Sequence, residues 1–290
     1  MNLAALTTTT TVAFCQDRTH DDVSIDGTAA KGPAKERVVS HLSRIRRLTG
    51  KNVGKAHVVS SSNFPAGAGL ASSASAFAAL TVAACTASGL TLSTDELSRL
   101  ARLGSGSACR SVPAGFVEWN ASESEERSFG RTIASPEHWD LHDVIAIIEP
   151  AHKPTGSTEG HHAAHTSPFQ AARVASIPAR LERCKAALLA RDWDALAPVI
   201  EEDALAMHAV MMTSTPSLFY WYPGTIAVMQ AVRAWRTLGH GVAFTIDAGP
   251  NVHCICPHDA AAMIEDLVRS IPGVSCVITS GVGGPARIVS

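Results

Sequence analysis

Residues 65–76 read PAGAGLASSASA, a stretch rich in glycine and serine that runs directly into a long apolar segment. Gly67 and Gly69 allow the backbone to approach a ligand and to adopt angles that other residues avoid. The first turn of a helix leaves backbone N–H groups unpaired and carries partial positive charge. Ser72 and Ser73 add hydroxyls at the same place. The stretch therefore predicts a phosphate cradle, and a chain that handles a nucleotide or a phosphorylated metabolite.

The alternative interpretation is a flexible loop before a core helix, because such stretches are common turn material. A Walker loop does not fit, since no Gly-Lys-Ser/Thr follows the glycines. The full pattern instead resembles the phosphate loop of the GHMP kinase superfamily, which includes galactokinase, homoserine kinase and mevalonate kinase. That resemblance implies that Mg²⁺ is held through the ATP phosphates, with Ser72 as its one candidate protein ligand. It also implies an ATP-binding set made of Pro65, Gly67, Gly69, Leu70, Ser72 and Ser73.

Composition narrows the class of protein. The chain has 290 residues, 46% of them hydrophobic, which is enough for one large or two ordinary domains with a substantial core. A formal net charge of −2 gives no basic surface for nucleic acid, so an anionic substrate needs a local site. No apolar run reaches the roughly 20 residues of a membrane span, and the threonine-rich N-terminus lacks a secretory pattern. Seven cysteines without zinc-type spacing predict reduced thiols in a cytoplasmic protein.

Hydrophobic periodicity predicts strands and helices in mixed order, which favours an α+β architecture with two layers per domain. A junction at residues 150–156 divides the chain into domains 1–152 and 153–290. Strands are expected at 3–15, 23–25, 56–60, 115–119, 128–133, 144–149, 242–247, 252–256 and 274–279. Helices are expected at 35–48, 70–88, 94–103, 168–190, 193–211, 223–238 and 259–270. The helix at 70–88 is apolar nearly all round, which predicts burial on several sides.

Residues 104–111 read GSGSACRS. Gly-Ser repeats are also linker material, but this segment lies between a helix that opens with a capping box at 93–96 and the strand at 115–119. A short helix start with serine hydroxyls suits an anion, and the Arg110 guanidinium can hold a carboxylate or phosphate through two parallel hydrogen bonds. The segment therefore predicts an anion clamp.

Residues 245–252 read TIDAGPNV, a strand that ends in a turn. The turn alone is the structural interpretation of this pattern. The functional interpretation places Asp247 at the strand end, where Gly249 and Pro250 force a tight backbone. A carboxylate held there, close to a phosphate loop, is a candidate general base.

Three motifs in the same order resemble the diphosphomevalonate decarboxylase family of the GHMP superfamily. They are NFPAGAGLASSAS at 63–75, GSGSACRS at 104–111 and DAGPN at 247–251. The resemblance spans essentially the whole chain, since it continues through GFVEW at 115–119, TGST at 155–158, LAMHA at 205–209 and STP at 214–216. Several multi-residue motifs in register are far more specific than one.

Members of this family convert mevalonate 5-diphosphate, with ATP and Mg²⁺, into isopentenyl diphosphate, CO₂, ADP and phosphate. The resemblance implies a GHMP kinase fold with a ribosomal-protein-S5-like N-terminal domain, a ferredoxin-like C-terminal domain and a homodimer. It also implies that Asp247 is the catalytic base and that Arg110 binds the substrate carboxylate. Further substrate contacts are then expected from Ser105, Ser107, Ser157, Thr158 and His161.

The sequence departs from the family pattern in two places. Relatives carry an earlier strand with a Lys-Tyr-Trp-Gly-Lys motif that contacts the substrate, so we expect a shortened N-terminus here, with an exposed sheet edge. Many relatives have methionine where His161 stands, near the end of the substrate that carries the phosphates. His162 and His165 follow, but they lack a partner cysteine or carboxylate at metal-binding spacing, so we assign no protein metal site.

Three alternative functions stay open. A changed diphosphate end favours a phosphomevalonate decarboxylase that makes isopentenyl phosphate. A GHMP small-molecule kinase would phosphorylate its substrate and stop, although the pairing of Arg110 with Asp247 argues against it. A non-catalytic nucleotide-binding remnant is favoured only by the missing lysine motif.

Overall fold

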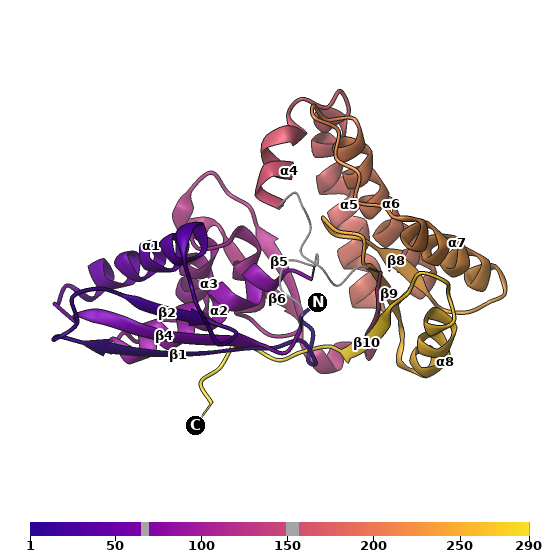
Figure 1. The fold of residues 1–290 in the computed structure, drawn as a ribbon. Coiled ribbons are helices and arrows are strands. Elements are labelled where there is room, and N and C mark those ends of the chain that lie inside the picture. The colour runs from indigo at the N-terminus through magenta and orange to yellow at the C-terminus, as the bar shows by residue number, and fades with distance from the viewer. Residues whose placement is uncertain (65–69, 149–156, 290) are drawn as a thin grey trace. The chain divides into compact units, whose positions relative to one another are not determined.

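The computed structural model describes residues 1–64, 70–148 and 157–289, which fall into two compact units (Figure 1). The first unit holds Met1–Phe64, Ala71–Pro136 and the C-terminal stretch from Val282, and the second holds Glu137–Gly281. Both combine sheets with helices, which confirms the predicted α+β class. Within the described residues, no helix has the length and apolar character that crossing a membrane requires.

The first unit is built on a four-stranded sheet. Its order is β1 (Thr8–Cys15), β4 (Lys55–Ser62), β2 (Asp22–Ile25) and β3 (Thr28–Ala29). β4 runs antiparallel to β1 and parallel to β2. Asp26 and Gly27 both have positive φ, 49° and 76°, which is the hairpin turn expected from an Asp-Gly pair.

Helices cover this sheet and carry the glycine- and serine-rich segments. They are α1 (Gly32–Thr49), α2 (Ser72–Ala87) and α3 (Thr94–Arg102), followed by the 3-10 helix η1 (Gly106–Ser111). α2 begins two residues after the start of the helix predicted at 70–88 and is buried on several sides, as expected. Ser93 and Glu96 form the predicted capping box at the start of α3. A two-stranded sheet of β5 (Phe116–Asn120) and β6 (Phe129–Ala134), with the short 3-10 helix η2 (Glu125–Arg127) between its strands, completes this part.

The second unit is a four-stranded antiparallel sheet with helices. The strands follow the order β10 (Cys276–Gly281), β7 (Leu141–Ile147), β9 (Val252–Pro257) and β8 (Ala243–Thr245). The helices are α4 (Ser157–Ala164), α5 (Gln170–Ala190), α6 (Trp193–Met212), α7 (Pro223–Thr237) and α8 (His258–Arg269). The sequence did not predict α4. The 3-10 helix η3 (Pro136–His138) precedes β7, and the predicted junction at 150–156 lies outside the described residues.

Alternation along the central strands gives the second sheet two different faces. Val144 and Ala146 of β7, with Cys254 and Cys256 of β9, join a buried apolar cluster with side chains of α7 and α8. The two cysteines therefore share one side of the strand, as expected from their spacing. The alternate residues of the same strands, among them Asp143 and His253, lie on the opposite face.

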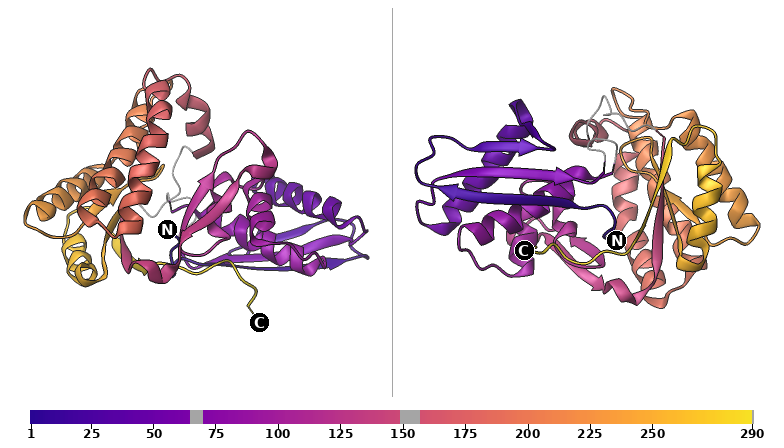
Figure 2. Two further views of the ribbon diagram at one scale, coloured as in Figure 1. Left: turned by 180° about the vertical axis from the view of Figure 1, so that it is seen from behind. Right: turned by 60° about the horizontal axis from the view of Figure 1, so that its bottom comes forward.

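The C-terminal stretch after β10 returns to the first unit. Val282 forms a bridge with Leu3, and the Gly283 N–H donates to the Asn2 carbonyl at 2.8 Å. The Ala286 N–H donates to the Val112 carbonyl at 3.0 Å, directly after η1. Residues 282–286 thereby brace the segment that carries Arg110. Figure 2 shows the path of this C-terminal stretch in yellow.

Candidate active site

The N-terminus of α2 forms the first part of the site. Ala71 adopts the left-handed conformation, with φ 52° and ψ 31°, and turns the chain into a helix that begins at Ser72. The N-cap residue, Ala71, makes no side-chain capping bond, so this helix end suits an anion. Leu70 is buried, whereas Pro65, Gly67 and Gly69 of the predicted phosphate loop lie outside the described residues.

Two predicted site serines meet beside this helix end. The Ser73 and Ser105 hydroxyl oxygens are 3.1 Å apart, which joins the first turn of α2 to the residue before η1. The close approach depends on Gly104, because a Cβ atom there would lie 2.1 Å from the Phe77 ring. A predicted ATP-binding residue and a predicted substrate-binding residue are thus neighbours within one unit. Ser107 lies one turn further along, half-buried in η1.

Arg110 is presented by a rigid backbone. The buried Ser98 hydroxyl donates to the Cys109 carbonyl at 2.7 Å and accepts from the Gly130 N–H at 2.8 Å, so one side chain ties η1 to α3 and β6. Gly130 allows this packing, since a Cβ there would lie 2.4 Å from the Cys109 carbonyl oxygen. The Arg110 side chain is exposed and forms no hydrogen bond or ion pair with the described residues. Its five donors are therefore available for an anionic ligand.

Asp247 lies in the second unit, two residues after β8, and is exposed. The Gly249 N–H donates to the Asp247 carbonyl at 2.8 Å and closes the predicted turn. The buried Thr225 hydroxyl donates to the Pro250 carbonyl at 2.6 Å, which fixes the turn to the start of α7. The carboxylate thus stands on a braced turn at a strand end, which is a suitable mount for a general base.

A buried charged pair lies next to Asp247. His253 Nδ1 is 2.7 Å from Asp143 Oδ2 on the face of the sheet opposite the helices. Burial acts to lower the pKa of His253, but the attraction of Asp143 and then of Asp247 outweighs it and raises that pKa to about 9. The imidazolium is therefore charged at neutral pH. Its Nε2 atom is buried without a hydrogen-bond partner among the described residues.

His208 has a structural role. It is buried in α6, and its Nε2 lies 3.1 Å from the Ile246 carbonyl oxygen. Burial lowers its pKa, against the opposing effects of that hydrogen bond and of Asp247. Neutral His208 therefore anchors the backbone just before Asp247.

The predicted substrate residues near the start of α4 are only partly described. Ser157 and Thr158 begin the helix, but their side chains lie outside the described part of the chain. His161 is exposed on α4, as are His162 and, after the helix, His165. Among the described residues these three histidines do not converge as metal ligands.

Both halves of the chain match models of known protein families. Residues 1–130 match the family of diphosphomevalonate decarboxylase-like N-terminal domains, and residues 143–280 match the mevalonate 5-diphosphate decarboxylase C-terminal domain. The chain belongs to the diphosphomevalonate decarboxylase family. These matches confirm the family resemblance that the three motifs indicated.

Two relatives define how far the family likeness extends. The diphosphomevalonate decarboxylase of Ganoderma lucidum is 38% identical over 223 residues, which cover 73% of this chain and 56% of that protein. The aligned region thus spans little more than half of the Ganoderma decarboxylase. The phosphomevalonate decarboxylase of Haloferax volcanii is 34% identical over 283 residues, 97% of this chain and 86% of that protein.

Solved structures of decarboxylases in this family share the fold. The crystal structure of mevalonate diphosphate decarboxylase from Staphylococcus aureus has a TM-score of 0.93 and 34% identity, and it matches 99% of this chain and 88% of its own. MDDEF in complex with MVAPP, AMPPCP and magnesium has a TM-score of 0.89 and 32% identity, with coverage of 98% and 87%. The GHMP kinase fold expected for the family is therefore confirmed.

Sequence reasoning about this decarboxylase family member missed two charged arrangements in the second unit. In the sequence, the acidic run at 201–203 has the pattern of a solvated helix face. In the structure, Glu201 is buried and pairs with Arg236 at 2.5 Å. The solvated-face interpretation is wrong for Glu201 because Arg236, 35 residues later, compensates its charge. The Asp143–His253 pair also escaped notice. Its one signal in the sequence was that His253 precedes Cys254 and Cys256 on one strand, which places the histidine on the face opposite the two cysteines.

Proposed function

We propose that the chain catalyses the ATP-dependent decarboxylation of mevalonate 5-diphosphate to isopentenyl diphosphate, as part of isoprenoid biosynthesis. The single observation that carries the proposal is the 3.1 Å contact between Ser73 and Ser105, because it brings the helix end suited to ATP phosphates beside the segment of Arg110. The complex of MDDEF with MVAPP, AMPPCP and magnesium supports ATP and Mg²⁺ as the nucleotide and the metal. Family membership supports the substrate class.

The start of α2 fits the ATP phosphates. Its uncapped N–H groups offer positive partial charge, and Ser72 and Ser73 add hydroxyl groups in the first turn. Mg²⁺, when bound, neutralises phosphate charge during phosphoryl transfer. The contribution of this chain is then positioning: the backbone holds the terminal phosphoryl group in line with the hydroxyl that it phosphorylates.

Asp247 acts on the tertiary hydroxyl of the substrate. That hydroxyl is crowded and weakly nucleophilic, so it needs a base that orients it and accepts its proton as the phosphoryl group arrives. The braced turn at 247–250 limits the positions that the carboxylate can adopt. Neutral His208 and the charged Asp143–His253 pair support this turn from either side, through the Ile246 carbonyl and through electrostatic attraction to Asp247.

Arg110 holds the substrate carboxylate before it leaves as CO₂. Departure of phosphate from the tertiary carbon draws the electron pair of the carboxylate C–C bond into the new alkene, and that bond breaks. A bidentate guanidinium fixes the carboxylate in the plane required for this step without forming a covalent bond to it. The proposal requires that Arg110 of the first unit and Asp247 of the second reach one substrate molecule. A substrate-bound crystal structure with either side chain away from the substrate would overturn it.

The test is an assay of all three products with ATP, Mg²⁺ and mevalonate 5-diphosphate. Equal amounts of ADP, CO₂ and isopentenyl diphosphate are expected. A stable 3-phosphorylated product without CO₂ would show a kinase instead. ATP binding by calorimetry without any turnover would show a non-catalytic protein.

Mevalonate 5-phosphate is the second candidate substrate. It is favoured by the match to the Haloferax volcanii phosphomevalonate decarboxylase, which covers nearly the whole of both chains. His161 is exposed on α4, where an imidazole would meet the substrate end that carries the phosphates. Comparison of kcat/KM for the monophosphate and the diphosphate decides between the two. A His161→Met variant that shifts the ratio toward the diphosphate would assign the selectivity to this side chain.

We further propose a cytoplasmic homodimer with an S5-like domain at 1–152 and a ferredoxin-like domain at 153–290. All seven cysteines are unpaired by disulfides, which supports a reducing compartment. The dimer rests on the family resemblance. Light scattering of the purified chain measures it directly.

A further inference from the structure

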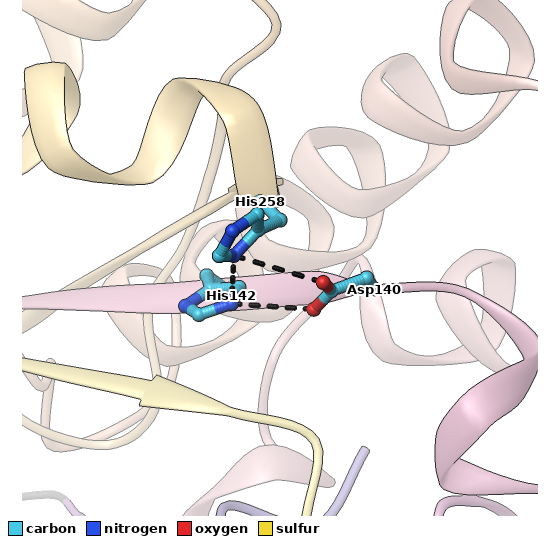
Figure 3. A group of neighbouring side chains, drawn as sticks. All are labelled: Asp140, His142 and His258. Atoms are coloured by element: carbon cyan, nitrogen blue, oxygen red, sulfur yellow. Dashed lines mark hydrogen bonds and ion pairs between the residues drawn. The ribbon is translucent and has the colours of Figure 1, made fainter.

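A second cluster of polar side chains lies away from the proposed active site. His142 Nε2 is 2.9 Å from His258 Nδ1 and 3.3 Å from Asp140 Oδ1, and His258 Nδ1 is 3.6 Å from Asp140 Oδ2 (Figure 3). Of the residues that the structure describes, these form the group of three whose donor atoms converge as metal ligands would. The residues come from the loop before β7, from β7 itself and from the first position of α8.

The spacing of the three donor atoms matches the edges of a metal coordination polyhedron. Ligands about 2.1 Å from a tetrahedral zinc ion lie about 3.4 Å from one another. The contacts of 2.9, 3.3 and 3.6 Å bracket that value, with His142 facing Oδ1 and His258 facing Oδ2 of Asp140, and one ligand atom from each residue lies within 4.8 Å of the other two. Two imidazoles and one carboxylate suit zinc and neighbouring transition metals, whereas Mg²⁺ and Ca²⁺ prefer oxygen ligands. Three protein ligands leave the fourth position for water.

Hydrogen bonds alone account for this arrangement of donor atoms less well than a bound cation does. One proton on His258 Nδ1 can point at His142 or at Asp140, but not well at both. A second proton on His142 Nε2 would bring two donors face to face at 2.9 Å. A cation at the centre satisfies all three lone pairs at once.

The backbone holds the three residues together before any ligand arrives. His142 pairs with Cys256 across the β7–β9 ladder, and Leu141 pairs with Pro257. The His258 N–H donates to the Asp140 carbonyl at 3.0 Å, which closes the connection between β7 and α8. The side chains of Asp140 and His258 are 69% and 67% exposed, so an ion can enter from solvent.

We propose that Asp140, His142 and His258 bind a zinc ion that ties the start of β7 to the start of α8. The site lies toward the opposite end of the β7–β9 ladder from His253, which pairs with Thr245 close to Asp247. Its role is therefore to stabilise the second unit and not to take part in the decarboxylation chemistry.

The other ring nitrogen of His142 is buried without a partner among the described residues, so no neighbouring acceptor fixes its tautomer. We accordingly expect weaker binding than in four-ligand zinc sites, with a Kd on the order of 1 μM.

Calorimetric titration of the full chain with ZnSO₄, after treatment with a chelator, tests the proposal. The Cys276→Ser background removes an exposed thiol that would compete for zinc. The titration should show one zinc ion per chain. Thermal unfolding with free zinc at a hundred times the Kd should show a rise in Tm of about 5 °C. Co²⁺ in the same titration should give the visible absorption of a tetrahedral nitrogen–oxygen site, which loosely bound surface metal lacks.

Substitutions then locate the ion. His142→Ala and His258→Ala should each weaken zinc binding by about 10² or more, and Asp140→Asn should weaken it by about tenfold. The matched control is His162→Ala with His165→Ala, two exposed histidines that should leave the affinity unchanged. Absence of saturable zinc binding would show a hydrogen-bonded cluster only and overturn the proposal. Binding that survives both His142→Ala and His258→Ala would overturn it equally. These readouts are independent of decarboxylase turnover, so failure here leaves the proposed function untouched.

Discussion

Two buried histidines, one in each unit, are held in opposite charge states. In the first unit His41 is fully buried in α1, with its Nε2 2.8 Å from the Thr81 hydroxyl. Burial, and then Arg44, lower its pKa to about 4. In the second unit His253 is buried against the Asp143 carboxylate, and its pKa is raised to about 9. Burial by itself favours the neutral ring, so the partner decides the charge.

The two proposed catalytic residues also differ in the charged groups that lie near them. Arg110 stands on a scaffold of neutral hydrogen bonds from Ser98, with no carboxylate of the described residues beside it. Asp247 stands near a buried imidazolium that is itself held by a second carboxylate. The first unit thus leaves its cation ready for an anionic ligand, whereas the second places one buried imidazolium near its anion. Substitutions in the two units should therefore fail in different ways.

The largest effect is expected for the base in the second unit. Asp247→Asn keeps the shape of the side chain but removes proton acceptance, so kcat should fall by about 10³. Steady-state release of CO₂ measures it. Asp266→Asn, an exposed aspartate on α8, is the matched control and should stay within twofold of the wild type. Turnover of Asp247→Asn within tenfold of the wild type would contradict the assigned role.

A smaller loss is expected in the first unit, and it should appear in a different kinetic constant. Arg110→Ala removes a charged bidentate contact, so kcat/KM for the phosphorylated acid should fall by about 10². Arg110→Lys should recover only part of the loss, because an ammonium group cannot reproduce the two parallel bonds. Arg127→Ala, an exposed arginine of the same unit, serves as the control. Equal KM values for Arg110→Ala and the wild type would remove Arg110 from the carboxylate site.

Local sequence signals predicted the elements that local rules govern. The capping box at Ser93, the turn at Asp26–Gly27 and the start of α2 depend on residues within a few positions of one another. The contact between Ser73 and Ser105 was not predicted, because it joins segments 32 residues apart, and the family resemblance assigned the two serines only separate roles. The roles predicted for the site residues, from Arg110 and Asp247 to Ser157 and Thr158, remain predictions.

Contacts between polar side chains that lie far apart in the sequence could not be predicted in the same way. His253 and Asp143 are 110 residues apart, and His142 and His258 are 116 apart. Their meeting depends on the register of β7 against β9, and a shift of one residue would move each side chain to the other face. Glu201 shows the same limit, since its burial depends on an arginine from another helix.

The pH dependence of stability should distinguish the two buried histidines, beginning with His253. Its folded pKa of about 9 exceeds the unfolded value of 6.5, so its contribution is complete below pH 6.5 and is lost as pH rises through 9. The loss is about 3 kcal/mol of unfolding free energy, which urea denaturation between about pH 6.5 and 9.5 measures. Burial raises the pKa of Cys256 to about 12, so that thiol does not titrate in this window.

His253→Gln should flatten this alkaline loss, and the variant should also be less stable at pH 6.5 because Asp143 is then buried without a counter-charge. Asp143→Asn with His253→Gln removes both charges and should recover part of that stability. An unchanged alkaline slope in His253→Gln would mean that His253 is neutral in the folded chain.

The smallest effect is expected from His41, and it has the opposite sign. Its folded pKa of about 4 lies below the unfolded value, so its contribution is present above pH 6.5 and falls as the solution is made acidic. Between about pH 6.5 and 5 the loss is about 2 kcal/mol, because the unfolded ring takes up a proton that the buried ring refuses. His41→Gln should reduce the acid loss by this amount, leaving the part that comes from His208, whose pKa burial also lowers, and the alkaline loss from His253 intact. His20→Gln, at an exposed histidine of the same unit, is the control. If His41→Gln kept the acid slope of the wild type, the neutral state of His41 could not be the source of that slope, and the contrast between the two units would be lost.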